Sequence, residues 1–467
     1  MSKKPNPLMI GSARIDITPS GPEPLLGYFN ERISTSVLDP LHCRMLGLRL
    51  DENRILIVQI DTCIIPTDFA RALRREIASN TPFKSREILL NASHTHTAPA
   101  LTGFFRTRMS GNYRSFLLDR ILRAAVLLAS GDPAGSPGPN VHTDHEAEQW
   151  KPCTVYGGLT EYRGLAFNRR WVMKGGEVVT NPPKRSPDRE RPEGGVDRTC
   201  GIVVFKTNGG PDVMLVNISN HADTIGGTEI SADWPGIMER EIEAGSGKPA
   251  VVLPLIAPQG NINHFDFDLP EEQASYSEAR RIGKAYAGVV LRLIRDMERV
   301  DVDTIGAEMR TVVIGPREIE PSELKRSEER AEKRAASTVS AGGESDLTAC
   351  GLARGNEEVE RELARELLLF NNAKKPRYEV PLQVIRIGNM RICAIPGEPF
   401  AEIGMELRNA VPGVKVLPVA LSNGYFGYVP LERSFTGGGY EVRPGRMNCL
   451  ERTAGTLILR ELKKMLS

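Results

Sequence analysis

Short apolar runs rich in β-branched residues alternate with amphipathic segments through the first half of the chain. Residues 54–61 (RILIVQID) and 86–93 (REILLNAS) have the composition of buried strands. Residues 67–79 (TDFARALRREIAS) and 114–130 (RSFLLDRILRAAVLLAS) instead carry apolar residues at helical spacing. This alternation predicts an α/β fold, in which a β-sheet core is flanked by helices.

A hairpin signal predicts that the sheet is mixed. Residues 201–207 (GIVVFKT) and 212–219 (DVMLVNIS) have strand composition, and the Asn-Gly-Gly-Pro sequence at 208–211 predicts a turn between them. Residues 249–256 (PAVVLPLI) and 414–422 (VKVLPVALS) predict two further buried strands. The sheet is therefore expected to contain antiparallel as well as parallel pairs.

From Pro321 to Lys375 the chain is rich in Glu, Lys and Arg, with Gly and Ser near 340–346. This composition predicts a charged helical hairpin, inserted at 321–375 and packed on the body. Pro and Gly at 131–140, and Pro and charged residues at 180–195, predict surface loops. No internal repeat is apparent, and the charged segment is not expected to form a domain of its own, so we expect residues 1–467 to form a single domain.

The overall composition argues against several classes of function. Hydrophobic residues make up 40% of the chain and charged residues 25%, which is typical of a globular enzyme. The net charge of +1 provides no long-range field to attract nucleic acid or an anionic membrane, and neither GxGxxG nor GxxxxGK[ST] occurs. We expect no nucleic-acid partner and no stable membrane association.

The N-terminal segment and the cysteines favour a reducing compartment. No apolar run of the kind found in signal peptides follows Met1, and no window of about 20 apolar residues could cross a membrane. The seven cysteines are scattered and never spaced as CxxC, which favours reduced, buried thiols. A cytoplasmic location is expected, unless a cleaved signal preceded this sequence.

The first candidate for chemistry is a pair of histidines. His94 and His96 lie within NASHTHTAP (91–99), directly after a predicted strand, where α/β sheets carry their sites. In an extended segment, residues two apart point to the same face, so the two imidazoles are expected to project together. The HxH pattern alone fits two hydrogen-bonded structural histidines equally well.

Other polar residues follow four more predicted strands. His221 follows residues 212–219, Glu398 follows RICAI (391–395), and Tyr425 and Tyr428 follow residues 414–422. Asn263 belongs to a polar segment, APQGNINH (257–264), after residues 249–256. Taken singly, Glu398 fits a charge at a helix N-terminus and Tyr428 fits a core aromatic. Together they provide residue types suited to zinc ligation and proton transfer.

The order of these segments resembles that of the neutral/alkaline ceramidases. SHTHTAP is similar to the THTHSGP motif of that family, and AIPGEPFAEIGMELR is similar to its PGEFTTMAGRRLR segment. IGSARIDITP resembles the opening segment, and AFNRR resembles NRS. SNGYFGYVP, followed by GGYEV, resembles a region with paired tyrosines. The resemblance extends from Ile10 to Tyr440.

The resemblance implies a zinc site and a set of residues around the scissile carbonyl. The implied zinc ligands are His94, His221, Glu398 and Tyr428. The residues implied around the carbonyl are His96, Arg169 and Tyr440. Imidazole, carboxylate and phenolate are acceptable zinc ligands, and a metal-bound water of pKa roughly 7 could attack an amide or ester carbonyl. Arg169 and Tyr440 could then stabilise the oxyanion.

One family position differs in a way that affects the mechanism. Asn263 stands where the ceramidases have a serine with a central catalytic role, and Asn261 replaces the preceding acid. An amide side chain cannot act as a nucleophile, so we predict attack by metal-bound water, with Asn263 positioning the substrate. We also expect no immunoglobulin-like domain, and a small or soluble acylated substrate rather than membrane ceramide.

Three functions follow from this pattern. The first is a zinc-dependent amidohydrolase that cleaves a C–N amide bond. The alternative is a zinc esterase or deacetylase acting on acylated sugars or lipids, because the same oxyanion chemistry cleaves both bonds. The third is an inactive ceramidase-like binding module, although nothing requires an inert scaffold to retain all four implied ligands.

Overall fold

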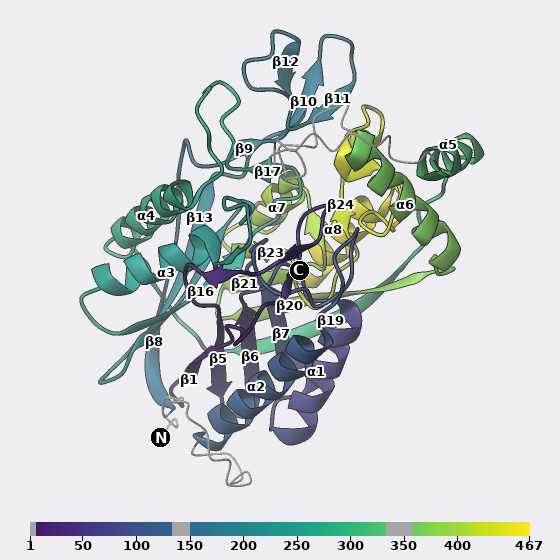
Figure 1. The fold of residues 1–467 in the computed structure, drawn as a ribbon. Coiled ribbons are helices and arrows are strands. Elements are labelled where there is room, and N and C mark those ends of the chain that lie inside the picture. Colours follow the sequence, from purple (N-terminus) through teal and green to yellow (C-terminus); the bar gives the residue numbers. More distant parts are fainter. Residues whose placement is uncertain (1–5, 133–149, 333–356) are drawn as a thin grey trace.

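Two β-sheets stack face to face between outer layers of helices in the computed structural model, which describes residues 6–132, 150–332 and 357–467 (Figure 1). The larger sheet has nine strands in the order β16-β14-β13-β8-β1-β5-β6-β7, with β18 also paired to β8. The pairs β6–β7 and β14–β16 are parallel, and the other pairs are antiparallel. The predicted α/β fold with a mixed sheet is confirmed.

The strands of the larger sheet are β1 (Met9–Asp16), β5 (His42–Leu50), β6 (Asn53–Ile60), β7 (Ile88–Ala92), β8 (Lys151–Glu161), β13 (Thr199–Thr207), β14 (Asp212–Ile218), β16 (Ala250–Ile256) and β18 (Glu298–Val300). The predicted hairpin is confirmed as β13 and β14. The strand predicted at 86–93 begins only at Ile88, because residues 85–87 form a 3-10 turn in which the Glu87 carboxylate accepts a hydrogen bond from the Lys84 N–H.

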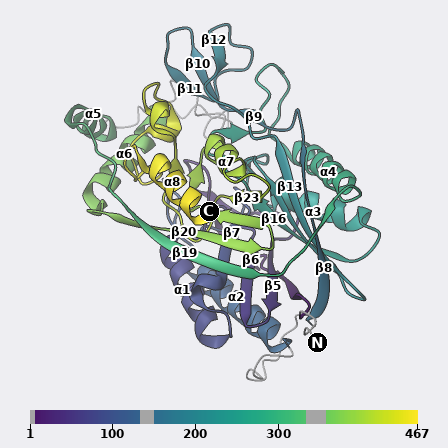
Figure 2. The same cartoon turned by 180° about the vertical axis from the view of Figure 1, so that it is seen from behind.

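The second sheet has the order β19-β20-β21-β23 and lies against one face of the larger sheet (Figure 2). Its strands are β19 (Ile305–Ile314), β20 (Tyr378–Ile387), β21 (Met390–Ala394) and β23 (Lys415–Val419). Leu48 and Leu215 of the larger sheet share one apolar core with Ile385 and Leu417 of the second. The two sheets are therefore joined by a continuous hydrophobic layer.

Helices cover the two outer faces. The helices α1 (Thr67–Asn80), α2 (Gly111–Ser130), α3 (Asp233–Gly245) and α4 (Tyr276–Leu293) pack on the free face of the larger sheet, in one apolar cluster with it (Figure 1). The helices α7 (Ala401–Arg408) and α8 (Ala454–Leu466) cover the second sheet. Among the described residues, no helix combines the length and apolar character needed to cross a membrane.

The charged insertion forms two packed helices, α5 (Pro321–Glu332) and α6 (Glu357–Ala373). This confirms the predicted helical segments, whereas the predicted break at 340–346 lies outside the described residues. Most of the loop predicted at 131–140 also lies outside them. The loop predicted at 180–195 is partly wrong, because β12 (Arg189–Pro192) pairs there with β10 (Arg170–Met173). The Arg189 guanidinium stacks on Trp171, 4.5 Å from the ring centroid, which favours this pairing over a free loop.

Candidate active site

His94, His221 and Glu398 converge from three distant segments. His94 follows β7, His221 follows β14, and Glu398 opens the short strand β22 (Glu398–Pro399) after β21. The Nε2 atoms of His94 and His221 lie 3.3 and 3.1 Å from Oε2 of Glu398, and each side chain is at most 2% exposed. The expected gathering of polar residues beyond strand ends is thus present for these three.

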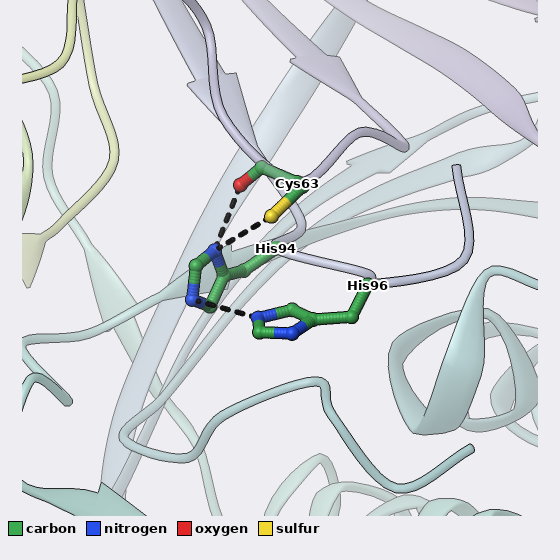
Figure 3. Close-up of side chains that lie close together, drawn as sticks. All are labelled: Cys63, His94 and His96. Atoms are coloured by element: carbon green, nitrogen blue, oxygen red, sulfur yellow. Dashed lines mark hydrogen bonds between the residues drawn. The ribbon is translucent and has the colours of Figure 1, made fainter. Parts of the chain in front are cut away.

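Hydrogen bonds fix the orientation of both imidazoles. Nδ1 of His94 donates to the Cys63 carbonyl at 2.7 Å, and Nδ1 of His221 donates to the Ile262 carbonyl at 2.6 Å. These bonds assign the ring protons to Nδ1, so both Nε2 lone pairs face Glu398. Figure 3 shows the contact of His94 with Cys63.

The group formed by His94, His221 and Glu398 has the donor chemistry of a cation site. Oε2 of Glu398 is buried without a hydrogen-bond donor, while two imidazole acceptors face it. Burial lowers the pKa of His94, but the Glu398 charge outweighs this effect and raises it, so the carboxylate attracts positive charge to this position. Burial lowers the pKa of His221 to about 4, so its Nε2 would remain an acceptor. A divalent metal satisfies all three atoms together.

The His94–His96 pair does not have the predicted extended geometry. His94 follows the end of β7 and has a φ of +68°, in the left-handed region, so the side chains do not share a strand face. The segment turns because the N–H groups of Ser93 and His94 donate to the Ile60 and Thr62 carbonyls. The two Nε2 atoms nevertheless lie 3.4 Å apart (Figure 3). The prediction of proximity is confirmed, but its geometric reason is wrong.

An acidic residue lies on the other side of His96. Nδ1 of His96 is 3.4 Å from Oδ1 of Asp223, and the Tyr28 hydroxyl donates to the same oxygen. Burial raises the pKa of Asp223 to about 7. The Arg32 guanidinium stacks 3.9 Å from the Tyr28 ring centroid and donates to the His96 carbonyl at 2.6 Å. Asp223 and Tyr28 were not predicted, although Asp223 lies only two residues after His221.

Arg169, which the resemblance implies around the scissile carbonyl, lies beside this group. Its Nη1 is 3.4 Å from Nε2 of His221, and its Nη2 donates to the Tyr428 hydroxyl at 3.1 Å and to the Gly260 carbonyl at 2.8 Å. Its Nε donates to Oε1 of Glu441 at 2.8 Å. The guanidinium is therefore held in one orientation from several sides.

Glu441 anchors two arginines. Its second oxygen accepts from Arg170 and from the Thr180 hydroxyl, each at 2.7 Å. Burial alone would raise the pKa of Glu441, but Arg169 and Arg170 outweigh that effect and lower it. The sequence interpretation did not single out Glu441, although it follows Tyr440 directly in the GGYEV segment.

Two tyrosines contact different charged groups: Tyr425 contacts Glu398, and Tyr428 contacts Arg169. Tyr425, not Tyr428, donates to Glu398, with its hydroxyl 2.7 Å from Oε1. Tyr428 is the register partner of Glu398 in the pairing of β22 with β24 (Tyr428–Val429), and its hydroxyl contacts Arg169. Its ring lies 5.5 Å from that of Tyr440, between centroids. Tyr428 as a fourth metal ligand stays a prediction.

The structure does not bring Asn263 to the cavity wall. Its amide donates to Oδ1 of Asn181 at 2.8 Å, and its oxygen accepts from the Phe265 N–H at 3.1 Å. Asn261 is similarly bonded, to the Glu402 carboxylate and the Ala401 N–H. Both amides therefore make bonds that hold local structure, which sequence position alone did not reveal.

A cavity opens over His94, His96 and Glu398, with Arg169, Asp223 and the three tyrosines 425, 428 and 440 in its lining. Most of the remaining lining is apolar and includes Leu26, Phe29, Ile64, Phe104, Phe105 and Met447. The arrangement combines a compact polar centre with an apolar enclosure. Such a site can bind an apolar group next to a polarised bond.

Comparison with solved structures identifies the fold of this chain. A neutral ceramidase from Pseudomonas aeruginosa matches with a TM-score of 0.70 and 16% sequence identity, over 98% of this chain and 74% of that one. A structure described as a ceramidase complexed with C2 matches with a TM-score of 0.70 and 17% identity, over 98% and 75% of the two chains. The chain has the ceramidase fold. No protein-family model and no curated protein sequence matches it. The ceramidase resemblance predicted from the sequence is thus confirmed at the level of the fold.

Proposed function

We propose that this protein is a zinc-dependent hydrolase that cleaves an amide bond in a small or soluble acylated substrate. The observation that carries the proposal is the convergence of two Nε2 atoms on a buried, unpaired carboxylate oxygen of Glu398. The ceramidase fold supports amide hydrolysis as the reaction class.

His94, His221 and Glu398 would hold the metal, with Tyr428 as the candidate for a fourth ligand. Zinc bound there would act as a Lewis acid on the substrate carbonyl and activate water near neutral pH. The hydrogen bonds from His94 and His221 to backbone carbonyls would keep their Nε2 atoms directed at the ion.

The remaining polar side chains have separate tasks in the proposed reaction. His96 would take a proton from the attacking water and pass it to the leaving amine, because its Nε2 faces the ligand group while Asp223 lies next to Nδ1. Arg169 and Tyr440 would stabilise the negative charge that develops on the carbonyl oxygen. Because Glu441 holds Arg169 in place, this charge would meet a preorganised partner.

The lining of the cavity supports water, rather than a side chain, as the attacking group. None of the described residues that line it is serine or threonine. Cys63 does line it, but burial raises the pKa of its thiol, which therefore stays protonated near neutral pH. A covalent acyl-enzyme is not expected.

The test is hydrolysis of matched N-acyl amides and acyl esters by protein freed of metal and then given Zn²⁺. We expect zinc-dependent turnover of the amides, with His94→Ala losing both metal and activity. His42→Ala, a histidine of β5 outside the cavity, is the matched control and should keep both. Turnover of esters alone would favour the esterase alternative, and zinc binding without any turnover would favour a binding module.

A further inference from the structure

Helix α6 of the charged insertion is hydrogen-bonded to two segments that contribute to the cavity wall, one at Phe104–Phe105 and one at Arg446–Met447. Glu366, 3% exposed, accepts a hydrogen bond from the backbone N–H of Phe105 at 2.8 Å. Its other oxygen accepts from Nε of Arg446 at 2.7 Å. Arg446 in turn donates to the Gly103 carbonyl at 3.1 Å and stacks 4.9 Å from the Phe104 ring centroid. A single buried carboxylate thus holds both neighbouring aromatic residues.

Phe105 needs such support because of its backbone. Its φ is +51°, in the left-handed region that bulky side chains rarely adopt. Glu366 binds the N–H of this residue, and Arg106, the next residue, forms ion pairs with Glu358 and Glu362 of the same helix. The helix therefore stabilises a strained conformation that directs an aromatic ring to the cavity.

Phe105 forms a continuous aromatic wall with three further rings. The centroid of Phe105 lies 4.5 Å from that of Phe29, and Phe29 lies 6.0 Å from Tyr440, which neighbours Tyr428. All four line the cavity over the proposed metal ligands. An extended apolar chain directed at this wall would have to displace the ring of Phe105, whose backbone is held by α6.

We infer that α6 sets the length of the substrate's acyl group: through Glu366 it fixes Phe105 as a wall that admits a short apolar acyl group and excludes long chains. This inference rests on the proposed function. In it, Phe105 determines specificity by direct contact, whereas Glu366 is a positioning residue that acts through Phe105 and Arg446.

The experiment measures kcat/KM of the zinc-loaded, full-length protein on N-acyl amides from acetyl to dodecanoyl. The key variant is Phe105→Gly, because glycine adopts a positive φ without strain and so removes the ring while keeping the backbone. We expect the wild type to prefer the short amides. Phe105→Gly should raise the ratio of long-chain to short-chain kcat/KM by about tenfold or more, since a single methylene in an apolar pocket already changes kcat/KM by that much.

Glu366→Gln should change the same ratio in the same direction, by less than Phe105→Gly, because an amide oxygen can still accept from the N–H of Phe105. The matched control is Glu360→Gln on the same helix. Glu360 pairs with Arg330 and Arg443 rather than with the Phe104–Phe105 segment, so its loss should leave the ratio unchanged. A purely structural role for Glu366 would lower kcat/KM equally for all chain lengths.

Failure of the inference and failure of the proposed function are distinguishable. If the wild type hydrolyses long-chain amides as well as short ones, or if Phe105→Gly leaves the ratio unchanged, the wall does not select chain length although the hydrolase function stands. If no amide is hydrolysed, the proposed function fails, and calorimetric binding of acetate, butyrate, octanoate and dodecanoate to the zinc-loaded protein then decides the inference. Tighter binding of the long carboxylates by the wild type would contradict it.

Discussion

Oε2 of Glu398 lies 3.1 Å from Nε2 of His221, although His221 directs its own ring proton to the Ile262 carbonyl. Two acceptors at this distance repel each other unless a cation lies between them. A second imidazole, that of His94, faces the same oxygen at 3.3 Å. We therefore predict that a metal ion binds between these three side chains.

Metal removal should destabilise the protein. At a zinc concentration about 1,000 times the dissociation constant, binding adds about 4 kcal/mol to the free energy of unfolding, so chelation should lower Tm clearly. Elemental analysis should find zinc in the wild type and little in Glu398→Gln. Equal Tm values with and without chelator, together with metal-free active protein, would contradict the metal site.

Asp223→Asn tests the proposed positioning of His96. The amide cannot pair with a protonated imidazole as the carboxylate does, so kcat should fall on the order of 10²-fold while zinc content stays unchanged. Asp266→Asn, an acid outside the cavity lining, serves as the control. An unchanged kcat in Asp223→Asn would remove Asp223 and His96 from the proton-transfer step.

Glu441→Gln tests how much the ion pairs of Glu441 with Arg169 and Arg170 stabilise the fold, and how this stabilisation depends on pH. Removing one partner of a buried ion pair should lower the free energy of unfolding at pH 7 by about 3 to 5 kcal/mol. The folded-state pKa of Glu441 is lowered, so its stabilisation is present above the unfolded-state pKa of about 4.3 and is lost as the pH falls through the folded-state value.

The difference in unfolding free energy between wild type and Glu441→Gln should therefore be constant from neutral pH down to about pH 5 and shrink below about pH 4. Denaturant titrations at several pH values measure it. Glu406→Gln removes an exposed pair with Lys463 and should show little difference at any pH. A difference that grows toward acid would show that Glu441 is not held as a carboxylate.

Asn263→Ala should affect folding more than catalysis. The Asn263 side chain bonds to Asn181 and to the Phe265 N–H, so its loss should lower the free energy of unfolding by about 1 to 3 kcal/mol and leave kcat nearly unchanged. Intact-protein mass spectrometry during turnover should find no acyl adduct. A large loss of kcat without loss of stability would restore the predicted contact of Asn263 with substrate.

The sequence predicted the elements and the site to different extents. The strands around the β13–β14 hairpin were predictable, since apolar runs and an Asn-Gly turn depend only on neighbouring residues. The gathering of His94, His221 and Glu398 was predictable only because strand ends and family motifs coincided. The roles of Tyr425, Asp223 and Glu441 were not, because each depends on contacts between segments far apart in the chain. The bonds of Asn263 to Asn181 and Phe265 were not predictable for the same reason.

The three proposed metal ligands come from both sheets. His94 and His221 follow strands of the larger sheet, whereas Glu398 follows β21 of the second, more than 170 residues further along the chain than His221. Neither sheet alone provides the three side chains, so an ion held by all of them would require the apolar layer between the sheets to have formed. Metal uptake would then report the completion of folding, and a chain arrested with its sheets apart would remain a poor competitor for zinc.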